Sequence, residues 1–242
     1  MPSRLLAELV ALVVPPLCAA CRRPLGRAGE VLCAACRADL PWLRGPRCPR
    51  CALPAPCAPC PAAGSAVEAA WAPLAYDGTA RAVVGALKFE GGFAVASVMA
   101  AQIVATAPPG LLAGRTAVPV PAHPGGARAR GFDQAALVAR AIARRAGLGL
   151  SACLERRGPG GRQLGAGRED RLAPGRLGVR VRGRAPARVL LVDDVHTTGA
   201  TLDACARVIR DAGGSSVAAV AYARTLPARS SVRPPDKRRS RA

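Results

Sequence analysis

Downstream of residue 65, short apolar runs alternate with longer segments in which apolar residues recur at helical spacing. The runs are short, apolar and bounded by turn residues, as buried strands are. We therefore expect strands at Ala69–Tyr76, Thr116–Val120, Val189–Val192 and Val217–Ala221.

Helices are expected between these strands. The predicted segments are Thr79–Phe89, Phe93–Thr106 and Asp133–Ala146, the last of which Gly147 closes. The apolar residues after the third strand share one face of a further helix: Leu202, Cys205, Val208, Ile209 and Ala212. Because strands and helices alternate along the chain, the pattern predicts an α/β fold in which a parallel sheet is flanked by helices.

The first residues are apolar but too short to cross a membrane. Leu5–Val14 is interrupted by Glu8, and no stretch of the chain approaches 18 uncharged apolar residues. No small-residue cleavage site precedes Cys18, so a short helix packed on the body is favoured over a signal peptide. We expect a cytoplasmic protein without a membrane span.

Eight of the ten cysteines lie before residue 61, in four CxxC pairs. Two residues between thiolates let both sulfurs of a tight knuckle face one tetrahedral Zn²⁺. The pairs predict one or two structural zinc sites built from Cys18, Cys21, Cys33, Cys36, Cys48, Cys51, Cys57 and Cys60. A disulfide scaffold is the alternative, but it suits a secreted protein better. The spacing leaves open whether successive or crossed pairs share a metal.

Composition and turn residues divide the chain into three parts. Pro61–Ser65 is typical of a linker, and Ser, Pro and Arg dominate from Arg229 onward. We expect an N-terminal helix and zinc ribbon over 1–64, an α/β domain over 65–226 and a disordered basic tail over 227–242. Gly158–Pro174 has little periodicity and is expected to form a mobile loop.

Basic residues exceed acidic ones by 20, and only two of them are lysines. Fourteen arginines and four acidic residues lie between positions 122 and 184, and the stretch 224–242 holds seven basic residues and one acidic residue. This concentration favours an anionic partner, either a phosphate ligand or a nucleic acid. For the tail, solvated surface arginine is an equally good interpretation.

The strand at Val189–Val192 leads into candidate binding chemistry. Asp193 and Asp194 follow it directly, and ligands of open α/β sheets bind at the carboxyl ends of strands. Hydroxyls and backbone N–H groups of Thr197–Thr201 then stand at a helix start, which suits a phosphate dianion. Two carboxylates would repel phosphate, so they are expected to reach ribose hydroxyls or a cation. The loop is not a Walker motif, because GxxxxGK[ST] is absent.

The segment 193–201, which reads DDVHTTGAT, resembles the 5-phosphoribosyl-1-pyrophosphate signature of type I phosphoribosyltransferases. Together with the CxxC pairs, the chain resembles the ComF family of competence-associated, phosphoribosyltransferase-like proteins, over nearly all of its length to about residue 225. Further matches to that family are Leu87–Phe89, Val118–Pro121, His123-Pro124, Arg130–Gln134, Gln163 and Arg171.

The resemblance implies a type I phosphoribosyltransferase fold and a role for each matching residue. Asp193 and Asp194 are implied to contact ribose hydroxyls as the catalytic pair. The other implied ligand contacts are Thr197, Thr198, Gly199, Ala200 and Thr201 for the 5-phosphate, His123, Arg128 and Arg130 for pyrophosphate, and Lys88 for an anion. A Mg²⁺ ion is implied among the pyrophosphate oxygens. His123 is equally well explained as a turn residue, and His196 is expected to point away from the ligand.

Three functions agree with these features. The first is an enzyme that transfers a phosphoribosyl group to an unidentified nitrogen base. The second is a protein that binds the sugar pyrophosphate or a nucleotide without turnover. The third is an accessory for single-stranded DNA or DNA-uptake proteins that uses its arginines and zinc module. The scarcity of aromatic residues weighs against the third.

Overall fold

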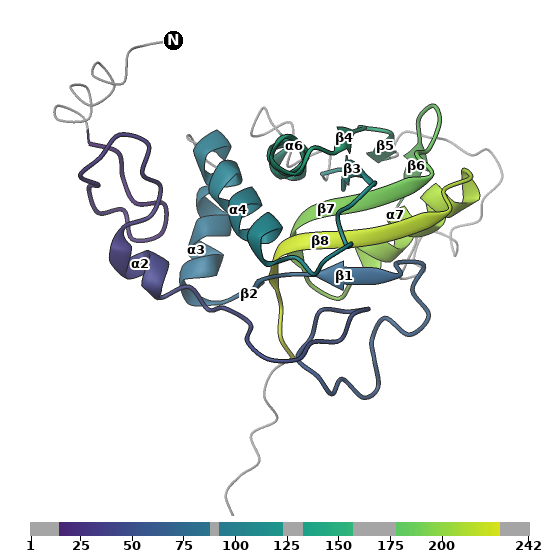
Figure 1. Cartoon of the computed structure of the whole chain (residues 1–242), viewed down its shortest axis with the longest axis horizontal. Coiled ribbons are helices and arrows are strands. Elements are labelled where there is room, and N and C mark those ends of the chain that lie inside the picture. Colours follow the sequence, from purple (N-terminus) through teal and green to yellow (C-terminus); the bar gives the residue numbers. More distant parts are fainter. Residues whose placement is uncertain (1–14, 88–91, 123–132, 157–177, 228–242) are drawn as a thin grey trace, which may run out of the picture.

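The computed structural model describes residues 15–87, 92–122, 133–156 and 178–227. Its centre is a sheet in the order β1-β8-β7-β3-β4, with β2 also paired to β8 and every pair parallel (Figure 1). The strands are β1 (Ala69–Trp71), β2 (Leu74–Ala75), β3 (Thr116–Pro119), β4 (Gly149–Leu150), β7 (Arg188–His196) and β8 (Ser216–Arg224). The predicted parallel α/β sheet is confirmed.

Helices cover both faces of the sheet, which explains why its central strands are apolar without alternation. On one face, Leu190 and Val192 pack in a core with α3 (Gly78–Ala86), α4 (Gly92–Thr106) and α6 (Gln134–Ala146). On the other face, Val189 and Leu191 pack with α7 (Ala200–Asp211). None of the described helices is long and apolar enough to span a lipid bilayer.

Capping residues set the start and end of α6 where the sequence predicts them. The Asp133 carboxylate accepts a hydrogen bond from Ala136 N at 3.2 Å, and Gly147 adopts the left-handed conformation that closes the helix. Asp77 caps α3 in the same way, through Gly78 N.

The structure departs from the predicted strands in two places. The expected strand Ala69–Tyr76 is interrupted at Ala72-Pro73, where Pro73 has no N–H to donate and its carbonyl accepts from Leu43 N. Strand β7 continues four residues beyond Val192, so the acidic pair lies within the strand. The first difference follows from a proline that the sequence itself shows, whereas the second comes from pairing with β8, which a local pattern does not contain.

Several short elements had no sequence prediction. They are α2 (Ala34–Ala38), β4, and the antiparallel pair of β5 (Leu154–Arg156) and β6 (Val179–Val181). Each has two to five residues, too few for a period to be recognised. The expected helix at Leu5–Val14, the loop Gly158–Pro174 and the tail lie outside the described residues.

The cysteine-rich part contains two copies of one hairpin. Leu17 bridges Pro24 in the first copy, and Arg47 bridges Pro54 at the equivalent positions of the second. The N–H of Cys18 donates to Arg23 O at 2.8 Å, and that of Cys48 donates to Leu53 O at 2.9 Å. The residue after the second cysteine of each hairpin has positive φ, +63° at Arg22 and +59° at Ala52. The CxxC sequence therefore folds twice into the same knuckle.

The cysteine-rich part covers the open edge of the sheet (Figure 1). Trp42 forms an antiparallel bridge with Leu74 of β2. Two further backbone bonds of 2.8 and 2.9 Å run from Ala70 N to Pro49 O and from Ala75 N to Pro41 O. An exposed strand edge invites pairing with other chains, so this cover protects the sheet.

We expect Leu74→Ala to lower the free energy of unfolding by about 2–5 kcal/mol, because Leu74 is fully buried where the cysteine-rich part meets the sheet. Leu150→Ala on β4 is the matched control and should cost less than about 0.5 kcal/mol, since Leu150 is 45% exposed. Urea unfolding of the zinc-loaded chain measures both. Equal losses would contradict the described packing.

Candidate functional site

The acidic pair lies at the carboxyl end of β7, in the middle of the sheet. Asp193 is opposite Ala221 of β8, and the last residue of β7, His196, is opposite Arg224. The Asp193 carboxylate accepts a hydrogen bond from Asp194 N at 2.9 Å, which fixes its orientation. The buried pairing of β7 with β8 therefore presents both carboxylates at the edge where α/β sheets bind ligands.

A pocket of about 190 Å³ opens beside this pair. It brings together the end of β7, the start of α7, the residues after β3, the start of α6 and the end of β5. Its lining residues are Val120, Pro121, Ala122, Asp133, Gln134, Ala135, Arg156, Asp193, Asp194 and Thr201. Three carboxylates and one guanidinium thus face one small volume.

Crowding of the carboxylates changes the protonation of Asp193. Burial, together with the nearby charges of Asp194 and Asp133, raises the pKa of Asp193 well above its usual range. The folded, ligand-free protein consequently holds a proton on Asp193 more tightly than the unfolded chain does.

Polar groups around the acids hold the pocket in shape. The Asp133 carboxylate accepts from Ala122 N at 3.3 Å while it caps α6, so it ties the two segments together. Arg156 Nε donates to Pro121 O at 2.8 Å. The side-chain nitrogen of Gln134 is buried and has no hydrogen-bond partner among the described residues. It is therefore a donor available to a ligand.

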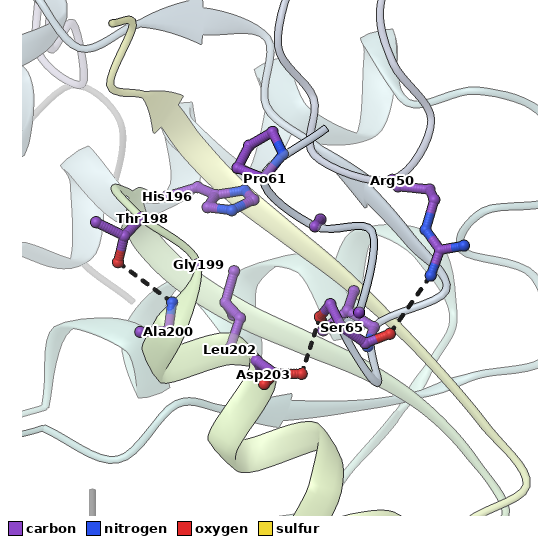
Figure 2. A pocket seen from close by; sticks show the side chains of 12 residues that line it. Arg50, Pro61, Ser65, His196, Thr198, Gly199, Ala200, Leu202 and Asp203 are labelled. Carbon is purple, nitrogen blue, oxygen red and sulfur yellow. Dashed lines mark hydrogen bonds between the residues drawn. The ribbon is translucent and has the colours of Figure 1, made fainter. Parts of the chain in front are cut away.

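The predicted phosphate loop lies between two pockets. Thr201 lines the pocket of the acids, and Thr197 is exposed. Thr198, Gly199 and Ala200 line a second pocket of about 270 Å³, which Figure 2 shows with Arg50 and Ser65 on its far side. Thr198 Oγ1 accepts from Ala200 N at 3.3 Å, and α7 has no side-chain cap among the described residues. The N–H of Ala200 is thus used within the loop, and the donors that follow it in the first turn of α7 are the candidates for an anion.

His196 belongs to the second pocket, beside Thr198 and Gly199 (Figure 2), and is not among the residues that line the pocket of the acids. Its ring is 5% exposed and packs on Gly199, whose φ is +87°. A Cβ at position 199 would lie 2.9 Å from His196 Nε2. Burial, aided by the charge of Arg224, lowers the pKa of His196 to about 4, so the ring is neutral at physiological pH. The expectation that His196 points away from the ligand stays a prediction, since its ring lies in the pocket that Thr198, Gly199 and Ala200 also line.

Arg224 lies beneath the phosphate loop, at the end of β8, and is 3% exposed. Its guanidinium donates to the carbonyl oxygens of His196 and Thr197 and, on the other side, to Cys51 O at 2.8 Å. This arginine therefore joins the loop to the cysteine-rich part.

The eight N-terminal cysteines form two clusters, each with its sulfurs within 4.8 Å of one another. Successive pairs share a cluster: Cys18, Cys21, Cys33 and Cys36 form one, and Cys48, Cys51, Cys57 and Cys60 form the other. This resolves the pairing in favour of successive pairs.

Sulfur separations in both clusters fit zinc. Cys21 and Cys33 sulfurs are 3.8 Å apart, and those of Cys48 and Cys60 are 3.7 Å apart. Tetrahedral zinc with bonds of ~2.3 Å places its sulfurs about 3.8 Å apart. The N–H of Cys33 points at Cys18 Sγ from 3.4 Å, a contact that stabilises a thiolate. Two tetracysteine sites therefore fit structural zinc, and the disulfide alternative does not fit these distances.

Sequence reasoning identified part of this site. Lys88, His123, Arg128 and Arg130 lie outside the described residues, as do Gln163 and Arg171. Arg156 and Arg224 had no prediction. In the sequence, Arg156 is one of several arginines after the apolar Leu154, and Arg224 is the charge that ends the apolar run of β8. Gln134 was noted only within the family motif and the expected helix, and Asp133, expected as the first residue of that helix, is its N-cap.

Comparison with known proteins bears on the N-terminal part. The model of the double zinc ribbon domain family matches residues 9–69, a range that contains both cysteine clusters and ends at β1. No curated protein sequence matches the chain. The N-terminal part is therefore similar to double zinc ribbons, which supports structural zinc in both clusters.

We expect Asp193→Asn to raise the melting temperature of the ligand-free protein at about pH 8. The raised pKa of Asp193 means that stability falls as pH rises from the usual aspartate pKa through the raised value. Asparagine carries no charge and can still accept from Asp194 N. The difference in melting temperature should vanish below about pH 4, where aspartate is also protonated in the unfolded chain. Asp211→Asn, on an exposed carboxylate, is the control for one lost charge. A lower melting temperature for Asp193→Asn across this range would contradict the assignment.

We expect Gly199→Ala to destabilise the protein more than Gly213→Ala. The two glycines have similar φ values of +87° and +92°, so both substitutions meet the cost of a left-handed backbone, about 1–2 kcal/mol. Only at position 199 would the new Cβ meet the His196 ring, since nothing lies within 4 Å of it at position 213. Denaturant unfolding measures the difference. Equal losses in the free energy of unfolding would show that the His196 ring can move away from the new Cβ without destabilising the protein.

Proposed function

We propose that the chain binds 5-phosphoribosyl-1-pyrophosphate in the pocket of the acids and transfers the phosphoribosyl group to a nitrogen base, as its resemblance to the ComF family implies. The observation that supports this most is that Asp193, Asp194 and Thr201 line one pocket at the carboxyl end of β7. In this proposal residues 1–64 are the zinc ribbon, residues 65–226 are a domain of type I phosphoribosyltransferase fold, and residues 227–242 are a basic tail.

The pocket offers hydrogen-bond acceptors, donors and positive charge that suit the ribose, the 5-phosphate and the pyrophosphate of this ligand. Ribose hydroxyls are donors, and Asp193 and Asp194 offer acceptors for them. The 5-phosphate takes the N–H groups at the start of α7, near Thr201. Arg156 also lines this pocket and is proposed as a partner for pyrophosphate oxygens. Lys88, His123, Arg128 and Arg130 are proposed to complete the anion contacts.

The donor set also suits a magnesium ion that accompanies the pyrophosphate. Carboxylate oxygens and water are its preferred ligands, and the pocket offers Asp133, Asp193 and Asp194. When bound, the ion neutralises charge on the leaving pyrophosphate. Its arrival would also favour the ionised form of Asp193, whose pKa is raised in the empty pocket.

The proposed reaction is displacement at the ribose C1 carbon. A nitrogen lone pair of the base forms the new bond to C1, and the bond from C1 to the pyrophosphate oxygen breaks with its electron pair on that oxygen. Positive charge develops on the sugar, where the carboxylates of Asp193 and Asp194 stabilise it. Arginine side chains stabilise the negative charge of the leaving group.

Single-stranded DNA is a less favoured ligand for the described surface. Base stacking requires free aromatic rings. Trp42 is bridged to Leu74 and packs on the core, and the Trp71 ring faces the Arg47 guanidinium at 3.3 Å. Both tryptophans are thus half-buried in contacts within the protein, and Phe93, which is 73% exposed on α4, gives the described residues a single free ring and not a row of rings for successive bases.

Calorimetry with 5-phosphoribosyl-1-pyrophosphate and Mg²⁺ tests the proposal. We expect the zinc-loaded wild type to bind and the double variant Asp193→Asn/Asp194→Asn to lose about 100-fold or more in affinity, because each lost charged hydrogen bond costs about 1.5–3 kcal/mol. Asp211→Asn is the control and should bind as the wild type does.

Undetectable binding by a folded, zinc-loaded wild type would overturn the proposal. If binding is measured, pyrophosphate release after addition of a set of nitrogen bases tests turnover. Release with one base class supports the transferase. Binding without pyrophosphate release in the presence of any base would contradict the proposed transfer reaction. The protein would then be a sensor of the sugar pyrophosphate.

A further inference from the structure

The two zinc knuckles have different surroundings although their backbones match. In the first hairpin, Cys21 and Arg22 are exposed to solvent. In the second, the equivalent Cys51 and Ala52 are 1% and 0% exposed, and Ala52 packs in the same core as α7. The second knuckle therefore buries Ala52 in the core beside α7, whereas the first knuckle buries Cys18 in the core beside α3 and α4 and exposes Cys21.

Arg224 links the second knuckle to the phosphate loop. Its Nε donates to Cys51 O at 2.8 Å, and its Nη1 donates to His196 O at 2.9 Å, to Thr225 O at 2.8 Å and to Thr197 O. All of these acceptors are main-chain carbonyls. The guanidinium consequently holds the backbone at the end of β7 relative to the backbone of a zinc ligand.

A second set of bonds links the same module to the other flank of the loop. Asp203, in the first turn of α7, accepts from Ala66 N at 2.7 Å and from Ser65 Oγ at 3.0 Å. Arg207 on the next turn donates to Gly64 O at 2.8 Å. Figure 2 shows Asp203 and Ser65 next to each other, with their hydrogen bond as a dashed line. The segment that leaves the second zinc cluster is thus attached to the helix that begins at the loop.

The loop itself has few contacts that could fix it independently. Thr197 and Thr198 are exposed, and the side-chain bond described within the loop joins Thr198 to Ala200. Its course is set by its two flanks, the end of β7 and the start of α7, and the second knuckle and its exit segment bond to both.

We propose that Arg224 is a positioning residue through which metal at Cys48, Cys51, Cys57 and Cys60 sets the geometry of loop 197–201, whereas metal at the first cluster does not. The consequence for ligand affinity rests on the proposed function; the consequence for the loop backbone does not.

The physical reason is the cost of an unsatisfied buried guanidinium. Without metal, the four sulfurs of the second cluster have nothing to hold them within 4.8 Å, and the knuckle that presents Cys51 O opens. Arg224 then loses one of its acceptors at a site that water barely reaches. The side chain must shift to recover it, and the carbonyls of His196 and Thr197 shift with the side chain.

Because each cluster combines one matching knuckle with one further CxxC pair, the two can be compared by equivalent substitutions in the full chain. Cys57→Ser/Cys60→Ser empties the second cluster, and Cys33→Ser/Cys36→Ser removes the equivalent ligands of the first. Metal analysis confirms that each variant holds one zinc and the wild type two. Hydrogen exchange of the amides of residues 196–201 is then compared among the three proteins, with no ligand present.

We expect exchange in the loop to accelerate about tenfold or more in Cys57→Ser/Cys60→Ser, within the usual range of coupling between sites, and to stay near wild type in the other variant. Arg224→Lys should accelerate amide exchange in the loop while both zinc ions are retained. Lysine lacks the guanidinium fork that reaches Cys51 O on one side and the carbonyls of His196 and Thr197 on the other. Equal exchange in the two cysteine variants, or an unchanged loop in Arg224→Lys, would overturn the proposal. Should a cysteine variant fail to fold, Arg224→Lys alone decides.

Affinity for 5-phosphoribosyl-1-pyrophosphate with Mg²⁺ supplies the second readout. We expect the variants that loosen the loop to bind about tenfold more weakly and the first-cluster variant to bind within twofold of wild type. If the wild type does not bind, the proposed function is wrong, and the exchange data still decide the coupling. If binding weakens equally in both cysteine variants, zinc acts only through general stability and the coupling is wrong.

Discussion

The parallel pairing of β7 with β8 is the interaction on which the rest of the structure depends. Both strands are buried on both faces, and their register places the end of β7 opposite the end of β8. Because parallel strands finish at one edge, the acidic pair of β7 and Arg224 of β8 arrive at the same place from distant parts of the chain. The pocket of the acids forms on one side of that place, and the second zinc knuckle docks on the other.

The cysteine-rich part is better understood as a wall of the α/β domain than as an appended module. Its first half contributes Leu25, Leu32 and Leu40 to the core shared with α3 and α4. Its second half closes the edge at β1 and β2 by backbone hydrogen bonds. In a chain with few aromatic residues, metal-held turns supply the rigidity that large apolar side chains provide in other small domains.

The candidate site contains carboxylates that lower the stability of the empty protein but suit a ligand. Three carboxylates around a pocket of about 190 Å³ repel one another, and a folded chain gains nothing from such an arrangement by itself. The same crowding supplies acceptors for ribose hydroxyls and a cation. Residues that work against stability in the empty protein are thus expected at a functional site.

The sequence alone determined the features that depend on local order. The α/β class, the caps of α6, the CxxC knuckles and the acidic pair followed by a helix start were predicted from it and are present, because period, capping chemistry and two-residue spacing act over a few neighbouring residues. Tertiary structure decided the rest. The extension of β7 through the acids and the placement of Arg156 and Arg224 depend on hydrogen bonds between residues far apart in the chain. The sharing of a metal depends on which cysteine pairs the fold brings together. A buried arginine such as Arg224 is indistinguishable from a surface one until its acceptors are known, since the carbonyls that satisfy it belong to other segments.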